Sequence, residues 1–312
     1  MLDVRERLPK YPVEKVTGLR LETAKQKLEA AMSAVNVVES ILFVIAISGF
    51  TLFLLLEKRQ PCKQIALSSL KRSLSTNTSA FLFNNVTMNI MSATSLLVVA
   101  ATYSRYGLLS GLADGPLKWT ISFIAFDFAV YAWHYLGHKS YQLWRFHKIH
   151  HSDKNLHVST GLRFHVFDQF LEVVFKCVCM IVIGVESHVV IVCELIRMLF
   201  VFFHHANFSF PGEKWLSYVV ITPALHRVHH STLRSEHDSN YGIVLSIWDI
   251  LFGTRKELIP KNIGLELIEA ENFLQLFSLA FVTEGRFAKT LHLLPRLEAS
   301  HAKRRAANLS SH

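Results

Sequence analysis

Three histidine clusters constrain this chain more than any other feature of its sequence. The first 133 residues contain no histidine, and fourteen of the seventeen histidines then fall between His134 and His237. One cluster has the spacing His-x3-His, and the other two repeat His-x-x-His-His. Their eight members are His134, His138, His147, His150, His151, His226, His229 and His230. Imidazole at this density is what a site for more than one transition metal requires.

The rest of the chain is apolar enough to predict a membrane protein. Hydrophobic residues make up 51% and charged residues 18%, against roughly 25% charged residues in ordinary soluble domains. The apolar residues gather in five blocks, at 41–56, 81–103, 119–136, 167–185 and 189–203. A helix needs about 17–25 residues to span the hydrocarbon. We therefore expect an all-α integral membrane protein with four or five transmembrane helices, the last two forming a tight hairpin.

The basic residues predict the side of the membrane on which the histidines lie. The loop predicted at 57–80 carries five Lys and Arg against one acid, whereas the loop at 104–117 carries only Arg105 and Asp114. The positive-inside rule then makes the first loop cytoplasmic. Following the spans from there brings every histidine cluster to the cytoplasmic face. We expect a cytoplasmic helical cap, built from helix ends and residues 138–165 and 205–260, that holds a histidine-rich dimetal site.

Three regions are expected along the chain. Residues 1–34 form a polar, amphipathic segment of mixed charge, unlike a secretory signal peptide. Residues 35–260 form the membrane-embedded domain, and residues 261–312 form an amphipathic segment and a basic tail, of which 274–281 is predicted to lie on the membrane. The net charge of +9 fits contact with anionic headgroups, and no pattern favours nucleic acid binding. Four cysteines without a CxxC exclude thiol redox work.

The spacing within each cluster indicates how the imidazoles are used. Residues i and i+4 of a helix share a face, as do the members of His-x-x-His-His if that segment is helical. Eight imidazoles exceed the four ligands of one zinc ion and suit two metals. No His-Glu-x-x-His occurs, which argues against a zinc protease, and the carboxylate-rich pattern of soluble di-iron bundles is also missing. An all-imidazole dinuclear iron site beside a bilayer indicates oxygen activation on a lipid.

Several further segments accompany the clusters in a fixed order. These are Asp127-x6-His134-x3-His138, LWRFHKIHHSD at 143–153, GLRFH at 161–165, FHHAN at 203–207, TPALHRVHHS at 222–231, DSNYG at 238–242 and WDxLFGT at 248–254. In this order and spacing the chain resembles the fatty acid hydroxylase/sterol desaturase superfamily of integral-membrane di-iron enzymes, over about residues 40–265.

The resemblance implies a set of metal ligands. The eight cluster histidines match the metal ligands of the family. The His-x-Asn of the family corresponds to His205 and Asn207, with His204 as the neighbouring alternative. His165 precedes Val166 where the family has His-Pro, so His165, like His237, is either a ligand or a residue beside the site or at the surface. We do not expect His157 or His188 to be ligands.

Four polar residues are candidates for supporting these ligands. Asp127 lies two helical turns before His134 on the same face. It can accept an N–H from a ligating imidazole, or else make a hydrogen bond between packed helices. Asn207, Asp238 and Asn240 are predicted to play similar supporting roles.

The resemblance also implies an activity. It is the O2-dependent hydroxylation or desaturation of a fatty acyl, sphingoid, sterol or carotenoid lipid. Two iron ions, O2 and an external electron donor such as ferredoxin or cytochrome b5 would take part. The expected location is the bacterial inner membrane or the endoplasmic reticulum, with the site facing the cytoplasm. Two alternatives stay open, a metal transporter and a catalytically silent lipid-binding protein. A transporter favours ligands at mid-membrane with repeat symmetry, whereas these clusters lie at helix ends.

Overall fold

The computed structural model describes residues 40–90, 96–266, 268 and 270–287. The segment expected at 1–34 and the tail beyond 287 lie outside the described residues. Contacts divide the chain into two compact units, Met1–Ser48 and Gly49–His312, and the features below belong to the second. The described residues form helices and no β-strand, which confirms the all-α prediction. The expected domain boundaries stay predictions.

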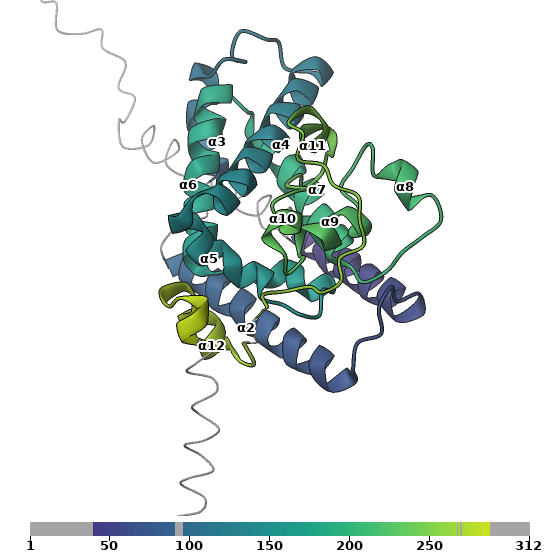
Figure 1. Cartoon of the computed structure of the whole chain (residues 1–312). Helices are drawn as coiled ribbons and strands as arrows, with labels where there is room; N and C mark the ends of the chain where they lie inside the picture. Colours follow the sequence, from purple (N-terminus) through teal and green to yellow (C-terminus); the bar gives the residue numbers. More distant parts are fainter. Residues whose placement is uncertain (1–39, 91–95, 267, 269, 288–312) are drawn as a thin grey trace, which may run out of the picture. The chain divides into compact units, whose positions relative to one another are not determined.

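The helices follow one another along the chain (Figure 1), with connections between α-helices that range from Ser140 alone between α4 and α5 to residues 252–272 between α11 and α12. The first is Ser40–Arg59, which begins in the first unit and ends in the second. It is followed by α2 (Leu67–Ile90), α3 (Leu96–Tyr103), η1 (Ser104–Tyr106), α4 (Pro116–Lys139), α5 (Tyr141–His151), η2 (Val158–Leu162), α6 (Val166–Ile183), α7 (Ser187–His205), α8 (Glu213–Leu216), α9 (Pro223–His229), α10 (Arg234–His237), α11 (Ile247–Leu251), α12 (Phe273–Ser278) and η3 (Leu279–Phe281).

Helices α3, α4, α6 and α7 pack side by side around one apolar core. The buried side chains of this core include Phe126 and Val130 of α4, Met180 of α6 and Val190 of α7. Helix α6 ends at Gly184, whose φ of 83° is the left-handed conformation that commonly terminates helices. Only residues 184–186 separate α6 from α7, as the predicted hairpin requires.

Helix α2 corrects one sequence prediction. It begins at Leu67, inside the segment expected to be a loop, and its described part runs to Ile90. Residues 91–95 lie outside the described residues, so a single span over 81–103 stays a prediction. The physical reason for the correction is the buried face of α2, which is largely polar and includes Ser73, Asn77 and Asn84. These side chains bond to other buried polar groups, whereas apolar side chains of α2 such as Val86 are exposed.

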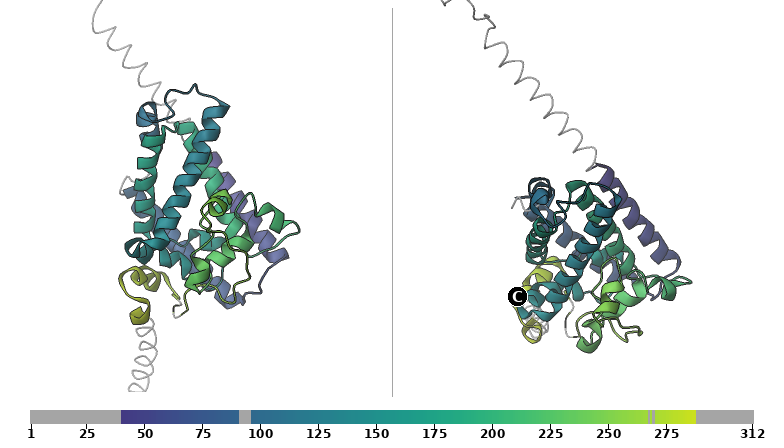
Figure 2. Two further views of the ribbon diagram at one scale, coloured as in Figure 1. Left: turned by 45° about the horizontal axis from the view of Figure 1, so that its top comes forward. Right: turned by 90° about the horizontal axis from the view of Figure 1, so that it is seen from above.

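A second apolar cluster joins α2 and α5 to the C-terminal segment. It contains Ala80 of α2, Ile149 of α5 and Leu276 of α12, together with further residues between 265 and 287. Figure 2 shows this C-terminal segment in yellow-green, and within it α12 packs against α2 whereas η3 packs against α5. The amphipathic stretch expected at 274–281 is therefore helical in α12 and η3, and part of it is buried against the core.

Two described helices are long and apolar enough to cross a membrane, Ser40–Arg59 and α7. Helix α4 has 24 residues and α6 has 18, and both carry exposed apolar side chains such as Phe128 and Val178. Neither meets the same test of length and composition. The expected number of four or five spans and the cytoplasmic cap thus stay predictions.

A buried ionic network fixes α2 against α5 and η2. The Asp153 carboxylate accepts hydrogen bonds from Ser73, Asn77 and Thr160. Arg163, also buried, donates to the Ile149 carbonyl and to the Asn77 side chain. Burial by itself raises the pKa of Asp153. The positive charge of Arg163 and the hydrogen-bond partners lower the pKa by more than burial raises it, so the net shift is downward. The charged pair holds the end of α5, where histidines are concentrated.

We expect Arg163→Met to destabilise the protein by about 3–5 kcal/mol, because it leaves the Asp153 charge buried without its cation. Thermal unfolding of the purified protein in detergent measures the change. Arg59→Met is the matched control, since Arg59 is exposed, and a surface change of this kind shifts stability by about 0.5 kcal/mol or less. Equal stability of the two variants would contradict the role given to Arg163.

Candidate metal centre

Four helices deliver the histidines to one place. Helix α4 carries His134 and His138 in its last two turns, and α5 carries His147, His150 and His151. Helix α7 ends at His204 and His205. Helix α9 begins with Pro223 at its first position, which suits a helix start, and carries His226 and His229, with His230 as its C-cap. All of these histidines are buried.

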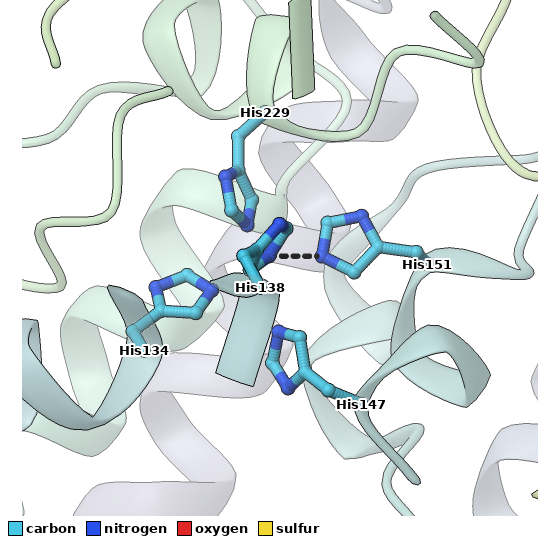
Figure 3. A group of neighbouring side chains, drawn as sticks. All are labelled: His134, His138, His147, His151 and His229. Carbon is cyan, nitrogen blue, oxygen red and sulfur yellow. Dashed lines mark hydrogen bonds between the residues drawn. The ribbon is translucent and has the colours of Figure 1, made fainter. Parts of the chain in front are cut away.

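The first histidine group contains His134, His138, His147, His151 and His229. One ring nitrogen of each lies within 4.8 Å of one ring nitrogen of every other. Figure 3 shows these five imidazoles converging from α4, α5 and α9. The Nε2 atoms of His138 and His151 are 3.1 Å apart. Three separate segments of the sequence therefore supply one compact set of nitrogen donors.

The second histidine group contains His150, His205, His226 and His230, again with ligand nitrogens within 4.8 Å of one another. Their Nε2 atoms form a chain of short distances. His205 lies 3.0 Å from His150 and 3.0 Å from His226, and His226 lies 3.1 Å from His230. Of the two neighbours at the end of α7, the structure thus brings His205 into a group.

The spacing of these nitrogens fits metal ions. Two nitrogens that share an ion at bond lengths of about 2.1 Å lie about 3.0–3.4 Å apart, as the Nε2 pairs here do. Two ring nitrogens of the first group, His147 Nε2 and His229 Nε2, are buried without a hydrogen-bond partner among the described residues. A cation would satisfy such atoms. Imidazole suits iron, zinc, copper and nickel, so the donor set fits iron without selecting it.

Backbone carbonyls hold several rings by the other nitrogen. The Nδ1 of His134 lies 2.7 Å from the Tyr241 carbonyl oxygen, and the Nδ1 of His229 lies 2.7 Å from that of Ser239. The Nδ1 of His205 is equally close to the Val201 oxygen. Because these carbonyls only accept, each ring donates through Nδ1 and leaves Nε2 as the ligand atom. The protein thereby fixes which tautomer faces the group.

One carboxylate does the same for a ring of the first group. Asp168 Oδ2 lies 3.0 Å from His147 Nδ1, and both side chains are buried. Asp238 Oδ1 lies 3.4 Å from His138 Nδ1, but the two atoms make no hydrogen bond with each other. Sequence reasoning named Asp238 but missed Asp168. The available signal was an acidic residue in the first turn of an apolar helix.

Burial and mutual proximity keep the imidazoles neutral. Desolvation lowers the pKa, and neighbouring imidazoles lower it further, at His150, His151, His226, His229 and His230. A neutral imidazole keeps the lone pair that a metal needs. The environment therefore favours metal binding over protonation at neutral pH.

Three predicted supporting residues contact other parts of the protein. Asp127 accepts from Trp248 Nε1 at 2.8 Å and from the Leu245 N–H, and no described imidazole bonds to it. Of the two alternatives for Asp127, the bond to an imidazole is therefore wrong, and Asp127 makes hydrogen bonds between packed segments instead. The reason is distance, because seven residues of helix place Asp127 about 10 Å from His134.

Asn207 and Asn240 are likewise held by backbone groups. The Asn207 side chain bonds to both backbone groups of Lys63. Asn240, at a φ of 54°, donates to the Leu225 and Lys256 carbonyls. Neither side chain has an imidazole as a hydrogen-bond partner in the described part of the chain, so both connect loops around the histidine groups.

Some of the remaining histidines lie beside the two histidine groups, and others lie away from them. His204 stacks 4.0 Å from His226 between ring centroids but belongs to neither group. His237 forms a third possible cluster with His138 and Asp238. His165 lies in neither group, because its Nδ1 accepts from the Phe167 N–H and its ring packs against Phe277. As expected, His157 and His188 lie outside both groups; His157 joins the Asp153 network and His188 is exposed.

A small cavity of about 40 Å³ opens beside both groups. A water needs about 10–15 Å³ measured in this way, so the cavity holds a few small molecules. Its lining includes His134 and His147 of the first group and His150, His205 and His226 of the second. The lining also contains apolar side chains, among them Val130, Trp133, Phe164, Val201 and Ile243, together with Asp168, Glu172 and Arg197.

Comparison with known proteins agrees with this site. The fatty acid hydroxylase family model matches residues 119–254, which contain both histidine groups. The match supports the fatty acid hydroxylase/sterol desaturase superfamily for this region, as the sequence resemblance predicted. No solved structure matches it significantly.

Three curated relatives carry hydroxylase or monooxygenase names. The ornithine lipid hydroxylase OlsE of Rhizobium tropici is 29% identical over 202 residues, covering 62% of this chain and 61% of that protein. The human alkylglycerol monooxygenase is 31% identical over 49% of this chain and 34% of its own. A cholesterol 25-hydroxylase-like protein of Danio rerio is 26% identical over 47% and 61% respectively. The matched region spans less than two thirds of each of these relatives.

We expect His150→Ala and His229→Ala each to remove about one of two bound ions, because they take one ligand from different groups. Elemental analysis of the purified variants measures the metal content. His188→Ala is the matched control, since the His188 side chain is 53% exposed and belongs to neither group. Full metal content in both group variants would show that these imidazoles do not bind metal.

We expect Asp168→Asn to weaken metal binding about 10–100-fold, since the carboxylate that orients His147 is lost. Competition with a chelator measures the affinity. Asp114→Asn, at a side chain that is 58% exposed, is the control. If the two variants lose metal at the same chelator concentration, Asp168 does not position the ligand.

Proposed function

We propose that this protein is an O2-dependent hydroxylase of a membrane lipid, with two iron ions as cofactors. The observation that carries the proposal is the pair of histidine groups beside one cavity, each with at least four buried imidazoles. The names of the relatives support a lipid as the substrate and hydroxylation as the outcome. Desaturation is the other outcome that the sequence left open.

Each histidine group would hold one ion. His134, His138, His147, His151 and His229 surround the first position, and His150, His205, His226 and His230 surround the second. His237 and Asp238 lie beside His138 of the first group, and His204 lies beside His226 of the second group. Iron bound there would supply the activation of O2, in a reaction that puts one oxygen atom into a C–H bond and releases the other as water, using two electrons and two protons.

The chain itself orients the ligands and shields the cavity. Asp168 and the Tyr241 carbonyl each accept a hydrogen bond from an imidazole Nδ1–H, which leaves the corresponding Nε2 free. Val130, Trp133 and Ile243 line the cavity with apolar surface, which suits the carbon chain of a lipid and excludes bulk water. The electrons would come from a separate protein of the ferredoxin or cytochrome b5 type.

A membrane location follows from the same proposal. Ser40–Arg59 and α7 are candidate spans, and α2 exposes Leu82, Val86 and Ile90 while burying polar side chains. An apolar exterior around a polar interior is what a bilayer requires. We propose an integral membrane protein whose histidine groups face the cytoplasm, in a bacterial inner membrane or the endoplasmic reticulum.

We expect the purified, iron-loaded protein to convert membrane lipid extract into hydroxylated lipid that carries isotope from labelled O2. A reductant and an electron-transfer protein are supplied, and mass spectrometry measures the product. His150→Ala and His229→Ala should form no product, whereas His188→Ala should match the unaltered chain. Metal movement across liposomes without O2 consumption would favour a transporter, and lipid binding without turnover would favour a silent scaffold.

A further inference from the structure

Four charged side chains form an ion-pair quartet between α6 and α7, next to the cavity. Helix α6 supplies Glu172 and Lys176, and α7 supplies Glu194 and Arg197. Lys176 Nζ lies 2.7 Å from Glu194 Oε1, and Arg197 Nη2 lies 2.8 Å from Glu194 Oε2. Helix α7 is also a candidate membrane span. Ionisable side chains in such helices are costly and usually mark a functional site.

The two acids of the quartet share the two cations unequally. Glu194 accepts hydrogen bonds from both Lys176 and Arg197. Glu172 Oε1 lies 3.2 Å from Lys176 Nζ and 3.8 Å from Arg197 Nη1. This oxygen atom is buried and receives no well-aligned hydrogen bond from the described residues, whereas the Glu172 side chain as a whole is 17% exposed. A buried carboxylate oxygen in this state is stabilised by any added donor.

Only part of the quartet faces the cavity. Glu172 and Arg197 line it, whereas Lys176 and Glu194 are not among its lining residues. The incompletely bonded acid is therefore the one that a molecule in the cavity can reach. The neutral charge of the quartet as a whole favours a small polar group over a large charged one.

The position of Glu172 also relates it to the metal centre. Asp168, which bonds to His147, precedes Glu172 by four residues on the same face of α6, a rise of about 6 Å. A donor bound at Glu172 thus lies within a few carbon–carbon bonds of the first histidine group. The apolar side chains Val130, Trp133 and Val201 in the same lining suit the carbon chain that follows.

We propose that Glu172 binds a hydroxyl or ammonium group of the lipid substrate, and so directs oxidation to a carbon close to that group. The inference rests on the proposed lipid hydroxylase function, because it assigns the occupant of the same cavity. It predicts a substrate class, lipids with a hydrogen-bond donor near the oxidised carbon, and it disfavours oxidation in the middle of an unsubstituted acyl chain.

Trp133 provides a local readout, since it lines the cavity. The full-length protein, loaded with iron and kept without reductant, is titrated with a bromoalkyl alcohol, a bromoalkyl amine and the bromoalkane of equal length. Bromine quenches tryptophan fluorescence on contact, and subtracting the signal of Trp133→Phe isolates Trp133. We expect the alcohol or the amine to bind about tenfold more tightly than the alkane, as a hydrogen bond to a charged group implies.

Matched variants assign the preference to one acid. Glu172→Gln should reduce it several-fold, because a neutral amide accepts a weaker hydrogen bond. Glu194→Gln makes the same change within the quartet but away from the cavity, and should retain the preference. The proposal is overturned if the three probes bind equally to the unaltered protein, if neither variant changes the preference, or if both variants lose it equally.

Metal content and hydroxylated product, measured on the same preparations, separate this inference from the proposed function. A protein that holds metal and forms product but shows no donor preference overturns the role of Glu172 alone. A protein that shows the preference but forms no product overturns the proposed hydroxylase activity and leaves the binding role of Glu172 in place.

Discussion

Crowded, buried imidazoles are the constraint on which the rest of the structure depends. Rings whose centroids lie 4.4–4.8 Å apart, as His134 and His229 or His150 and His205 do, cannot all be charged. Each ring must instead be neutral and correctly oriented, which Nδ1 bonds to carbonyls and to the Asp168 carboxylate achieve. The segment from 238 to 256 places two of these acceptors, the carbonyls of Ser239 and Tyr241. Asp249 accepts from the Tyr241 and Gly242 N–H groups, and the Tyr241 carbonyl holds His134.

The same constraint explains why the interior is polar and much of the exterior apolar. Helix α2 directs Ser73, Asn77 and Asn84 inward, toward the network of Asp153 and Arg163 that holds the end of α5. Its side chains Leu67, Leu82, Val86 and Ile90 are exposed. A soluble protein would arrange these residues in the opposite way. The distribution therefore supports the proposed membrane setting beyond what the two candidate spans indicate.

Much of the site could be predicted from local spacing. The His-x3-His and His-x-x-His-His patterns place their members on shared helix faces, and the position of His205 before Asn207 distinguished it from His204. Long-range partners could not be predicted in this way. Asp168 and the carbonyls of Tyr241 and Ser239 lie at least ten residues from the rings they hold, and Asp127, on the helix face of His134, bonds to Trp248 instead.

By itself the sequence determined the donor atoms, the helical class of the fold and the number of imidazoles, which exceeds the needs of one ion. Only the tertiary structure decided how the imidazoles divide. His150 and His151 are adjacent in α5 yet belong to different groups, because consecutive residues of a helix point about 100° apart. Helices α7 and α9 place histidines that these two side chains meet. The positions of α7 and α9 result from packing across the whole fold.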